Sequence, residues 1–313
     1  MNLSRDRNKR MSSRPVDSSL NADLSSGFTF VYSAVFLMSL NGLFAKVIPL
    51  DAASITALRS FIAVVGLGLF GLIRNRRYRL PSMAHLVGVY GLGVLLGIHW
   101  VTFFHSMQVS TVAVGMLSLF SFPILTILVE PLFSRERLAG GDIVAGILVL
   151  AGLSVMVSQD LADLHGPILS GVFWGVGSAF LFATRNLVQK YFFQDVTSDT
   201  LLFHQGIAIA VMLLPFLGVR QTAILPLSGI VNLLLLGILC TAGAHTFYAA
   251  SLKRLPAKSV ALIGCLQPVL ATLFAWLVIQ ETPQLNVLFG GAIILSVAAY
   301  ESAGKRSRPL LRR

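Results

Sequence analysis

The chain alternates between long apolar stretches and short polar ones. Its apolar blocks are each close to the roughly 20 residues with which a helix crosses a bilayer. Because lipid offers no hydrogen-bond partners to an open backbone, these blocks are predicted to be helices. The ten blocks are residues 28–48, 52–73, 83–107, 111–133, 139–158, 167–190, 198–219, 226–251, 256–280 and 285–302. Residues 1–27 are polar, which predicts a disordered tail, and residues 303–313 form a basic tail.

The two halves of the chain resemble each other. With a shift of 145 positions, FPILTILVEPLFSRE (122–136) aligns with QPVLATLFAWLVIQE (267–281). The residues paired by this shift are Pro123 with Pro268, Glu136 with Glu281, Gly146 with Gly291, Ser106 with Ser251, Phe103 with Tyr248, and Arg59 with His204. The halves, 28–158 and 167–302, hold five predicted spans each, so the second copy must be inverted in the membrane. The predicted fold is an all-α membrane protein with ten transmembrane helices in two inverted five-helix repeats.

Paired prolines fall inside two of the predicted spans. Pro123 lies in the fourth block and Pro268 in the ninth. Each proline removes a backbone donor and is expected to bend its helix. Two readings are open. Bends at equivalent points suit the wall of a cavity, and membrane helices also tolerate prolines without any special role.

Charge sets the expected orientation. Charged residues make up only 12% of the chain, while hydrophobic residues make up 55%. With the N-terminus placed in the cytoplasm, 20 of the 24 Lys and Arg residues fall in cytoplasmic segments, and only Arg220 falls in an outer loop. This distribution predicts that both termini are cytoplasmic. The net charge of +11 therefore indicates membrane topology, and no nucleic-acid partner is expected.

The second half carries a family resemblance. TFYAASLKRLPAKSVALIGCLQPVLATLFAWLVIQET (246–282) resembles the second half of an EamA-domain protein of the drug/metabolite transporter superfamily. The first half matches more loosely, through Lys46, Arg59 in LRSFIA, Pro123, and Glu136 in RERL. The resemblance implies ten spans and export of small metabolites, amino acids or drugs across the bacterial inner membrane. The partners it implies are a small-molecule substrate and the lipid bilayer, and it leaves a homodimer open.

Arg59 is the foremost candidate for contact with cargo. It lies seven residues into the second span, roughly 10 Å from the outer boundary. Its guanidinium stays charged and presents a planar fork that suits a carboxylate. Two interpretations stand side by side: an anchor for cargo, or a structural pair with Asp51. His204, its repeat mate, is expected to be neutral and hydrogen-bonded, with a proton switch as the alternative.

Aromatic and histidine side chains gather in neighbouring spans. His99, Trp100 and Phe103 lie close together in the third span, and His99 and Phe103 share one helix face. The repeat places His245 on Trp100, and Tyr248 on Phe103; Trp174 adds another ring. These six residues predict either the wall of a cavity for an amphipathic solute or ordinary packing. Gly93 with Gly97, and Gly171 with Gly175, predict close helix contacts.

Three acidic residues and two basic ones lie near span ends. Glu130 has no partner in the second repeat, where Ala275 stands. It is a candidate proton or cation coupling site, and the alternative is a carboxylate that reaches the interface near Arg135 or Arg137. Glu136 and Glu281 are expected to cap or pair at a helix start. Lys46 and Arg185 lie near span ends and are expected to extend toward the interface.

The sequence carries no catalytic motif of the membrane enzymes. There is no His-Glu-x-x-His, Gly-x-Ser-x-Gly or phosphate-binding glycine loop, so no catalytic residue, metal or cofactor is expected. The predicted function is an inner-membrane secondary transporter, an exporter working by alternating access. A channel or a non-transporting scaffold is the alternative, followed by a membrane enzyme.

Overall fold

The computed structural model describes residues 16–133, 140–156, 166–252 and 263–304, with Ser158, Arg254, Leu255 and Val260 between these ranges. Every regular element in this part of the chain is helical. The helices are α1 (Val16–Val47), α2 (Ala52–Ile73), α3 (Met83–Val109), α4 (Val112–Leu119), α5 (Phe122–Val129), α6 (Gly140–Met156), α7 (Pro167–Phe192), α8 (Ser198–Leu213), α9 (Val219–Ala223), α10 (Leu227–Leu235), α11 (Ala244–Leu252), α13 (Leu266–Ile279) and α14 (Leu285–Gly304). Two 3₁₀ turns, η1 (Glu130–Leu132) and η2 (Leu214–Phe216), and one π-helix, η3 (Leu236–Gly243), complete the described elements.

The helices coincide with the predicted apolar blocks. Six of them are long and apolar enough to cross a membrane, and four shorter apolar helical stretches occupy the remaining blocks. Only 39–44% of each long span is buried inside the bundle, and large apolar side chains such as Phe61, Phe173, Leu72 and Phe289 are exposed. An apolar exterior of this extent requires lipid around it. The chain is therefore a multi-pass helical membrane protein.

Polar caps explain where several spans begin. Asp51 accepts a hydrogen bond from the backbone N–H of Ser54 at 2.9 Å, and this contact starts α2 at the predicted residue 52. Ser82 caps α3 through the N–H of His85, and Thr111 caps α4. Each side chain satisfies a donor that the first turn of a helix leaves unpaired.

The expected disorder of residues 1–27 is wrong for residues 16–27. Helix α1 begins at Val16, twelve residues before the predicted first span. A helix that is already nucleated in the membrane extends at the gain of one hydrogen bond per added residue, so polar composition alone does not end it. Residues 1–15 and 305–313 lie outside the described residues.

Both paired prolines lie just after a break between helical segments, at the places where a bend was expected. The fourth expected span is divided into α4 and α5, with Phe120 and Ser121 between them, and Pro123 stands in the first turn of α5. Pro268 stands in the first turn of α13, which begins directly after a turn at Cys265. Proline is tolerated in a first turn because the N–H that it lacks has no intrahelical partner there. The two breaks therefore fall at positions that the 145-residue shift makes equivalent.

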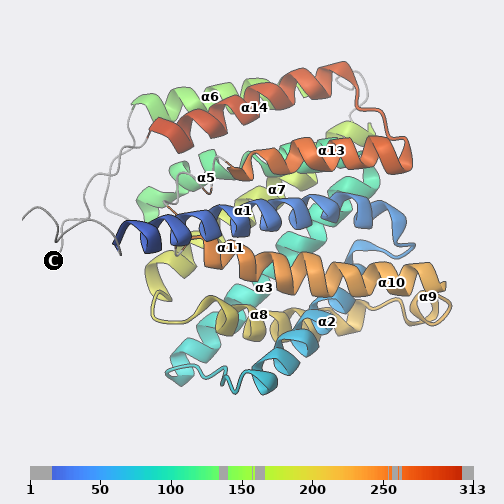
Figure 1. Ribbon diagram of the computed structural model, residues 1–313. Helices are drawn as coiled ribbons and strands as arrows, with labels where there is room; N and C mark the ends of the chain where they lie inside the picture. The colour runs from blue at the N-terminus through green and yellow to red at the C-terminus, as the bar shows by residue number, and fades with distance from the viewer. Residues whose placement is uncertain are drawn as a thin grey trace, which may run out of the picture.

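The helices form one bundle in which segments far apart in sequence lie side by side. Helix α1 packs against α11 and α13, α3 packs against α7 and α8, and α2 packs against α8. Helices α6 and α14 pack on each other at the top of Figure 1, and this pair contacts α4 and α5. Helix α1 runs through the middle of the same view, and α2, α3 and α8 lie below it.

Glycines allow the closest of these contacts. A Cβ added to Gly171 would lie 2.0 Å from the Ser110 Oγ, and one added to Gly97 would lie 2.7 Å from the Met212 Cε. The Gly93–Gly97 pair faces α8, and the Gly171–Gly175 pair faces the α3–α4 junction. Both glycine pairs are packing motifs, as predicted.

Candidate substrate-binding site

Arg59 lies in the interior of the bundle, and only 1% of its surface is exposed. Its guanidinium carbon lies 4.4 Å from the ring centroid of Trp100 and 4.9 Å from that of Phe104. Its Nε donates a hydrogen bond to the Thr241 Oγ1 at 3.0 Å. A cation held between two ring faces gains about 0.5–2 kcal/mol per ring, depending on its desolvation.

The expected structural pair with Asp51 does not form. Both carboxylate oxygens of Asp51 are engaged by Ser54, whose N–H and hydroxyl donate to them. None of the ion pairs among the described residues includes Arg59. The guanidinium therefore keeps its full positive charge in the membrane interior, held by rings and a hydroxyl but not neutralised by a carboxylate.

The π-helix η3 brings Thr241 to Arg59. The Thr241 hydroxyl donates to the carbonyl oxygen of Leu236, five residues back, and accepts from Arg59. Gly237 permits the approach, because an added Cβ would lie 2.6 Å from Ile62 on α2. The equivalent residues in the first repeat, 91–98, are ordinary α-helix within α3. A π-helical segment inside a span is rare and is frequent at functional sites.

Two histidines continue the cluster away from Arg59. The ring of His245 lies 5.8 Å from Trp100, centroid to centroid. His99 is 3% exposed and stacks on Phe182, and the charges of Arg59 and Arg185 both reach His99 and His245. We call this group, Arg59, His99, Trp100, Phe104, Arg185, Thr241 and His245, the central cluster. It contains two permanent cations and, within the described residues, no carboxylate.

His99 also joins two helices. Its Nδ1 lies 2.7 Å from the Ser178 Oγ and 3.0 Å from the Ser178 carbonyl oxygen, and the Ser178 hydroxyl donates to the His99 carbonyl. These contacts tie α3 to α7 and fix the ring in place. Phe103, which is stacked on His99 at 6.1 Å, is buried in the core beside it.

Arg185 does not extend to the interface, contrary to expectation. It donates through Nη2 to the Gln205 Oε1 and through Nη1 to the Asn186 Oδ1. Gln205 is fully buried on α8, so this bond keeps the guanidinium inside the bundle.

Three other candidates lie apart from the central cluster. His204 places its Nε2 2.9 Å from the Tyr78 carbonyl oxygen, which fastens the loop between α2 and α3 to α8. Tyr248 packs with Val31, Val35 and other apolar residues between α1 and the end of α11. Trp174 is 37% exposed on α7 and contacts His105 edge to face. These contacts lie at helix packing surfaces and at a loop, outside the central cluster.

Glu130 contacts the end of α7. Its Oε1 lies 2.7 Å from the Lys190 Nζ and accepts from the Tyr191 hydroxyl at 2.9 Å. Arg135 and Arg137 lie outside the described residues. The geometry joins η1 to α7 at the end of both spans, which favours an interfacial anchor.

Glu281 has the structural role that was expected, with a different partner. Its Oε1 accepts from the backbone N–H of Val112 at 2.6 Å, which caps α4 in place of the next helix. Its Oε2 lies 3.7 Å from the Lys46 Nζ, and that ammonium donates to the Ser110 carbonyl oxygen. Glu136 lies outside the described residues.

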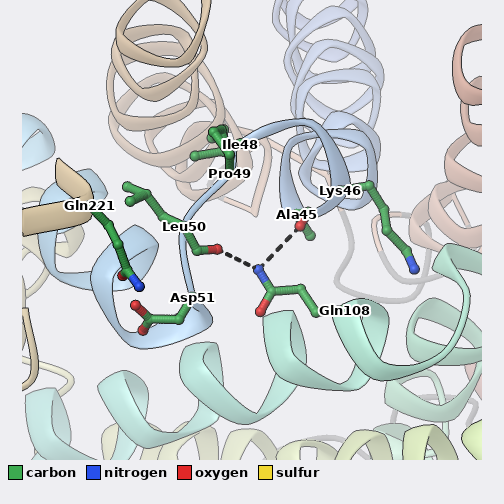
Figure 2. A pocket seen from close by; sticks show the side chains of 8 residues that line it. All are labelled: Ala45, Lys46, Ile48, Pro49, Leu50, Asp51, Gln108 and Gln221. Atoms are coloured by element: carbon green, nitrogen blue, oxygen red, sulfur yellow. Dashed lines mark hydrogen bonds between the residues drawn. The ribbon is translucent and has the colours of Figure 1, made fainter. Parts of the chain in front are cut away.

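A surface pocket of about 340 Å³ opens beside the turn between α1 and α2 (Figure 2). Figure 2 shows Gln108 at its floor, donating to the carbonyl oxygens of Ala45 and Leu50. Asp51 caps α2 and Lys46 bonds to Ser110, so three of the polar side chains around the pocket, with Gln108, already have partners. This pocket is explained by the turn, and the central cluster remains the candidate site.

Sequence reasoning missed Phe104 and Thr241 as members of the central cluster, and Gln205 as the partner of Arg185. Thr241 carries no signal of its own, because the π-helix that positions it has no distinctive pattern. Phe104 lies next to the predicted Phe103, and its position against Arg59 depends on the tilt between α2 and α3. Gln205 follows His204 directly, and only the histidine was considered from the sequence because it can titrate.

Polar and charged groups buried within a bundle of apolar helices are typical of membrane transport proteins. The chain belongs to the EamA-like transporter family, whose model matches it twice, over residues 25–158 and 169–300. The predicted resemblance is thus confirmed, with one family domain in each half.

Relatives of known name are also transporters. The chain is 24% identical over 261 residues to "Uncharacterized transporter YxxF" of Bacillus subtilis, covering 82% of each chain. It is 24% identical over 210 residues to "S-adenosylmethionine uptake transporter" of Rickettsia felis, covering 66% of this chain and 69% of the relative. A solved protein structure covers 90% of this chain and 99% of its own at 21% identity with a TM-score of 0.60, which shows the shared fold.

Proposed function

We propose that this transporter is an alternating-access carrier of small organic solutes that bear a carboxylate, and that Arg59 holds the carboxylate. The observation that carries the proposal is the burial of Arg59 without an ion-pair partner in the described part of the chain. A guanidinium presents two parallel donors that match the two oxygens of a carboxylate. The aromatic rings around it suit the apolar body of the same solute.

The energetics support a cargo role. An arginine at the centre of a membrane helix costs about 2.5–3.5 kcal/mol on insertion scales. Trp100, Phe104 and Thr241 offset part of this cost in the empty protein. They leave the charge itself available, which a structural carboxylate such as Asp51 would not. Arg59 is closed off in this conformation, so cargo requires a second conformation that opens the cluster to one side.

Matched helix contacts support two inverted repeats, 28–158 and 167–302. Under the 145-residue shift, α1 corresponds to α7, α3 to α10 and α11, and α4 with α5 to α13. Helix α1 packs against α11 and α13, and α7 correspondingly packs against α3, α4 and α5. Helices α2 and α8 pack on each other, as do α6 and α14. A pseudo-twofold relation of this kind is the basis of rocking carriers.

The remaining features of the proposal concern sidedness. The distribution of Lys and Arg supports a bacterial inner-membrane location with both termini cytoplasmic. Export stays a prediction, and one relative bears the name of an uptake transporter. Coupling through Glu130 also stays a prediction, although its contacts with Lys190 and Tyr191 favour an anchor.

Counterflow in proteoliposomes tests the carrier. A metabolite-tolerance screen of an overproducing strain first supplies a solute, which is then loaded at high concentration inside vesicles of the purified protein. A carrier accumulates the radiolabelled solute transiently against its gradient, and its flux saturates. Linear flux that follows voltage, without counterflow, would identify a channel, and chemical turnover of the solute would identify an enzyme.

A further inference from the structure

Arg185 and Gln205 form a buried polar pair between α7 and α8 that is only partly satisfied. Arg185 Nη2 donates to the Gln205 Oε1. The Arg185 Nε and the Gln205 Nε2 are both buried, and neither has a hydrogen-bond partner in the structure. Gln205 is 0% exposed, so water does not compensate its amide from outside. Two N–H donors from bonded side chains are therefore left unpaired in the membrane interior.

Unpaired donors would destabilise the protein if Arg185 and Gln205 served only to hold α7 and α8 together. Each buried, unsatisfied donor costs about 1–3 kcal/mol. A purely structural contact between helices at this place could be made by apolar side chains, which carry no donors to satisfy. Helix α3 lies against both α7 and α8. Unpaired donors on an arginine and an amide are the arrangement that receives an anion.

The pair lies at the opposite end of the central cluster from Arg59. Arg59 stands seven residues from the start of α2, and Arg185 stands seven residues before the end of α7. Each lies roughly 10 Å inside its helix end. In the orientation predicted from charge, Arg59 is nearer the outer face and Arg185 nearer the cytoplasm. The charges of both arginines reach His99 and His245.

We propose that Arg185 and Gln205 form a second carboxylate-binding subsite, and that cargo passes between this subsite and Arg59 during transport. The proposal rests on the proposed function, since the cargo is the same carboxylate. The subsite takes the anionic group through the Arg185 Nε and the Gln205 Nε2. With one positively charged binding site near each membrane face, a carboxylate has a partner in both the inward-facing and the outward-facing conformation.

Gln205→Glu tests the subsite, because it is nearly isosteric and places a carboxylate beside Arg185. This internal carboxylate occupies the subsite, so the empty protein should melt at a higher temperature than the parent. Binding of phenylacetate to the purified protein in lipid nanodiscs should weaken at least tenfold, about 1.4 kcal/mol. Phenylacetamide, which has the same shape without the charge, is the matched ligand control. Gln194→Glu, at an exposed position outside the cluster, is the matched protein control and should bind phenylacetate like the parent.

A second variant covers the case in which Gln205→Glu does not accumulate. Gln205→Met keeps the volume and removes the amide, and it should also weaken phenylacetate binding at least tenfold. Phenylacetate binding that matches the parent in whichever variant accumulates overturns the subsite, and so does a parent that binds phenylacetate no better than phenylacetamide. Arg59→Lys separates the two proposals. If it leaves phenylacetate binding unchanged while the Gln205 variants weaken it, the role of Arg59 fails and the subsite stands.

Discussion

Replacing Gly171 by alanine tests the closest helix contact in the structure. The added Cβ would lie 2.0 Å from the Ser110 Oγ and 2.4 Å from the Ser110 Cβ. The hydroxyl alone cannot relieve the clash, because the Cβ moves only with the backbone at the α3–α4 junction. Overpacking of this kind costs about 1–3 kcal/mol. Gly177→Ala on the same helix is the control, since its added Cβ meets nothing within 4 Å.

The free energy of unfolding is measured by reversible titration with sodium dodecyl sulfate, followed by circular dichroism. We expect Gly171→Ala to lose about 1–3 kcal/mol. Gly177→Ala should be neutral or gain up to about 1 kcal/mol, because alanine is the better helix former. Equal stability of the two variants would refute the close approach of α7 to the α3–α4 junction.

Three further predictions follow from single contacts. Glu281→Ala leaves the Val112 N–H without its acceptor and should cost about 1.5–3 kcal/mol of unfolding free energy in the same titration. Glu281→Gln keeps an acceptor oxygen and should cost less than half as much. Equal losses in the two variants would show that the charge of Glu281 matters more than the cap. Glu130→Gln should leave the pH dependence of transport unchanged, and a shifted pH profile would make that carboxylate a coupling site. A reporter active only in the cytoplasm should work when fused after Arg313 and fail when inserted within 159–166; activity in the latter position would contradict the predicted topology.

The sequence predicted the spans well because lipid imposes a simple rule. A run of apolar residues of sufficient length has to be helical, and α2 coincides with its predicted block at both ends. The same rule does not say where a helix ends outside the membrane, and α1 begins twelve residues before its predicted block. Proline marks the two helix breaks because it acts on its own backbone, so its effect needs no tertiary information.

The candidate site was predicted only in part, because its members meet through tertiary packing. Arg59, Trp100 and His245 were found from their cost in the membrane and from the repeat. Asp51 was a plausible partner by sequence distance, but its carboxylate is used by its own helix start. Thr241 depends on a π-helix that no periodicity reveals. Depth along a span can be counted from sequence, whereas the direction of a side chain around it depends on neighbouring helices.

The central claim is that Arg59 receives a carboxylate through its two-pronged guanidinium. The most direct measurement compares phenylacetate with phenylacetamide by calorimetric titration of the parent and of Arg59→Lys in nanodiscs. Lysine keeps the charge and loses the planar fork. We predict that the parent binds the carboxylate at least tenfold more tightly than the amide, about 1.4 kcal/mol, and that Arg59→Lys loses most of this preference while inserting into the membrane like the parent. An Arg59→Lys variant that keeps the full preference, or a parent that shows none, would contradict the account.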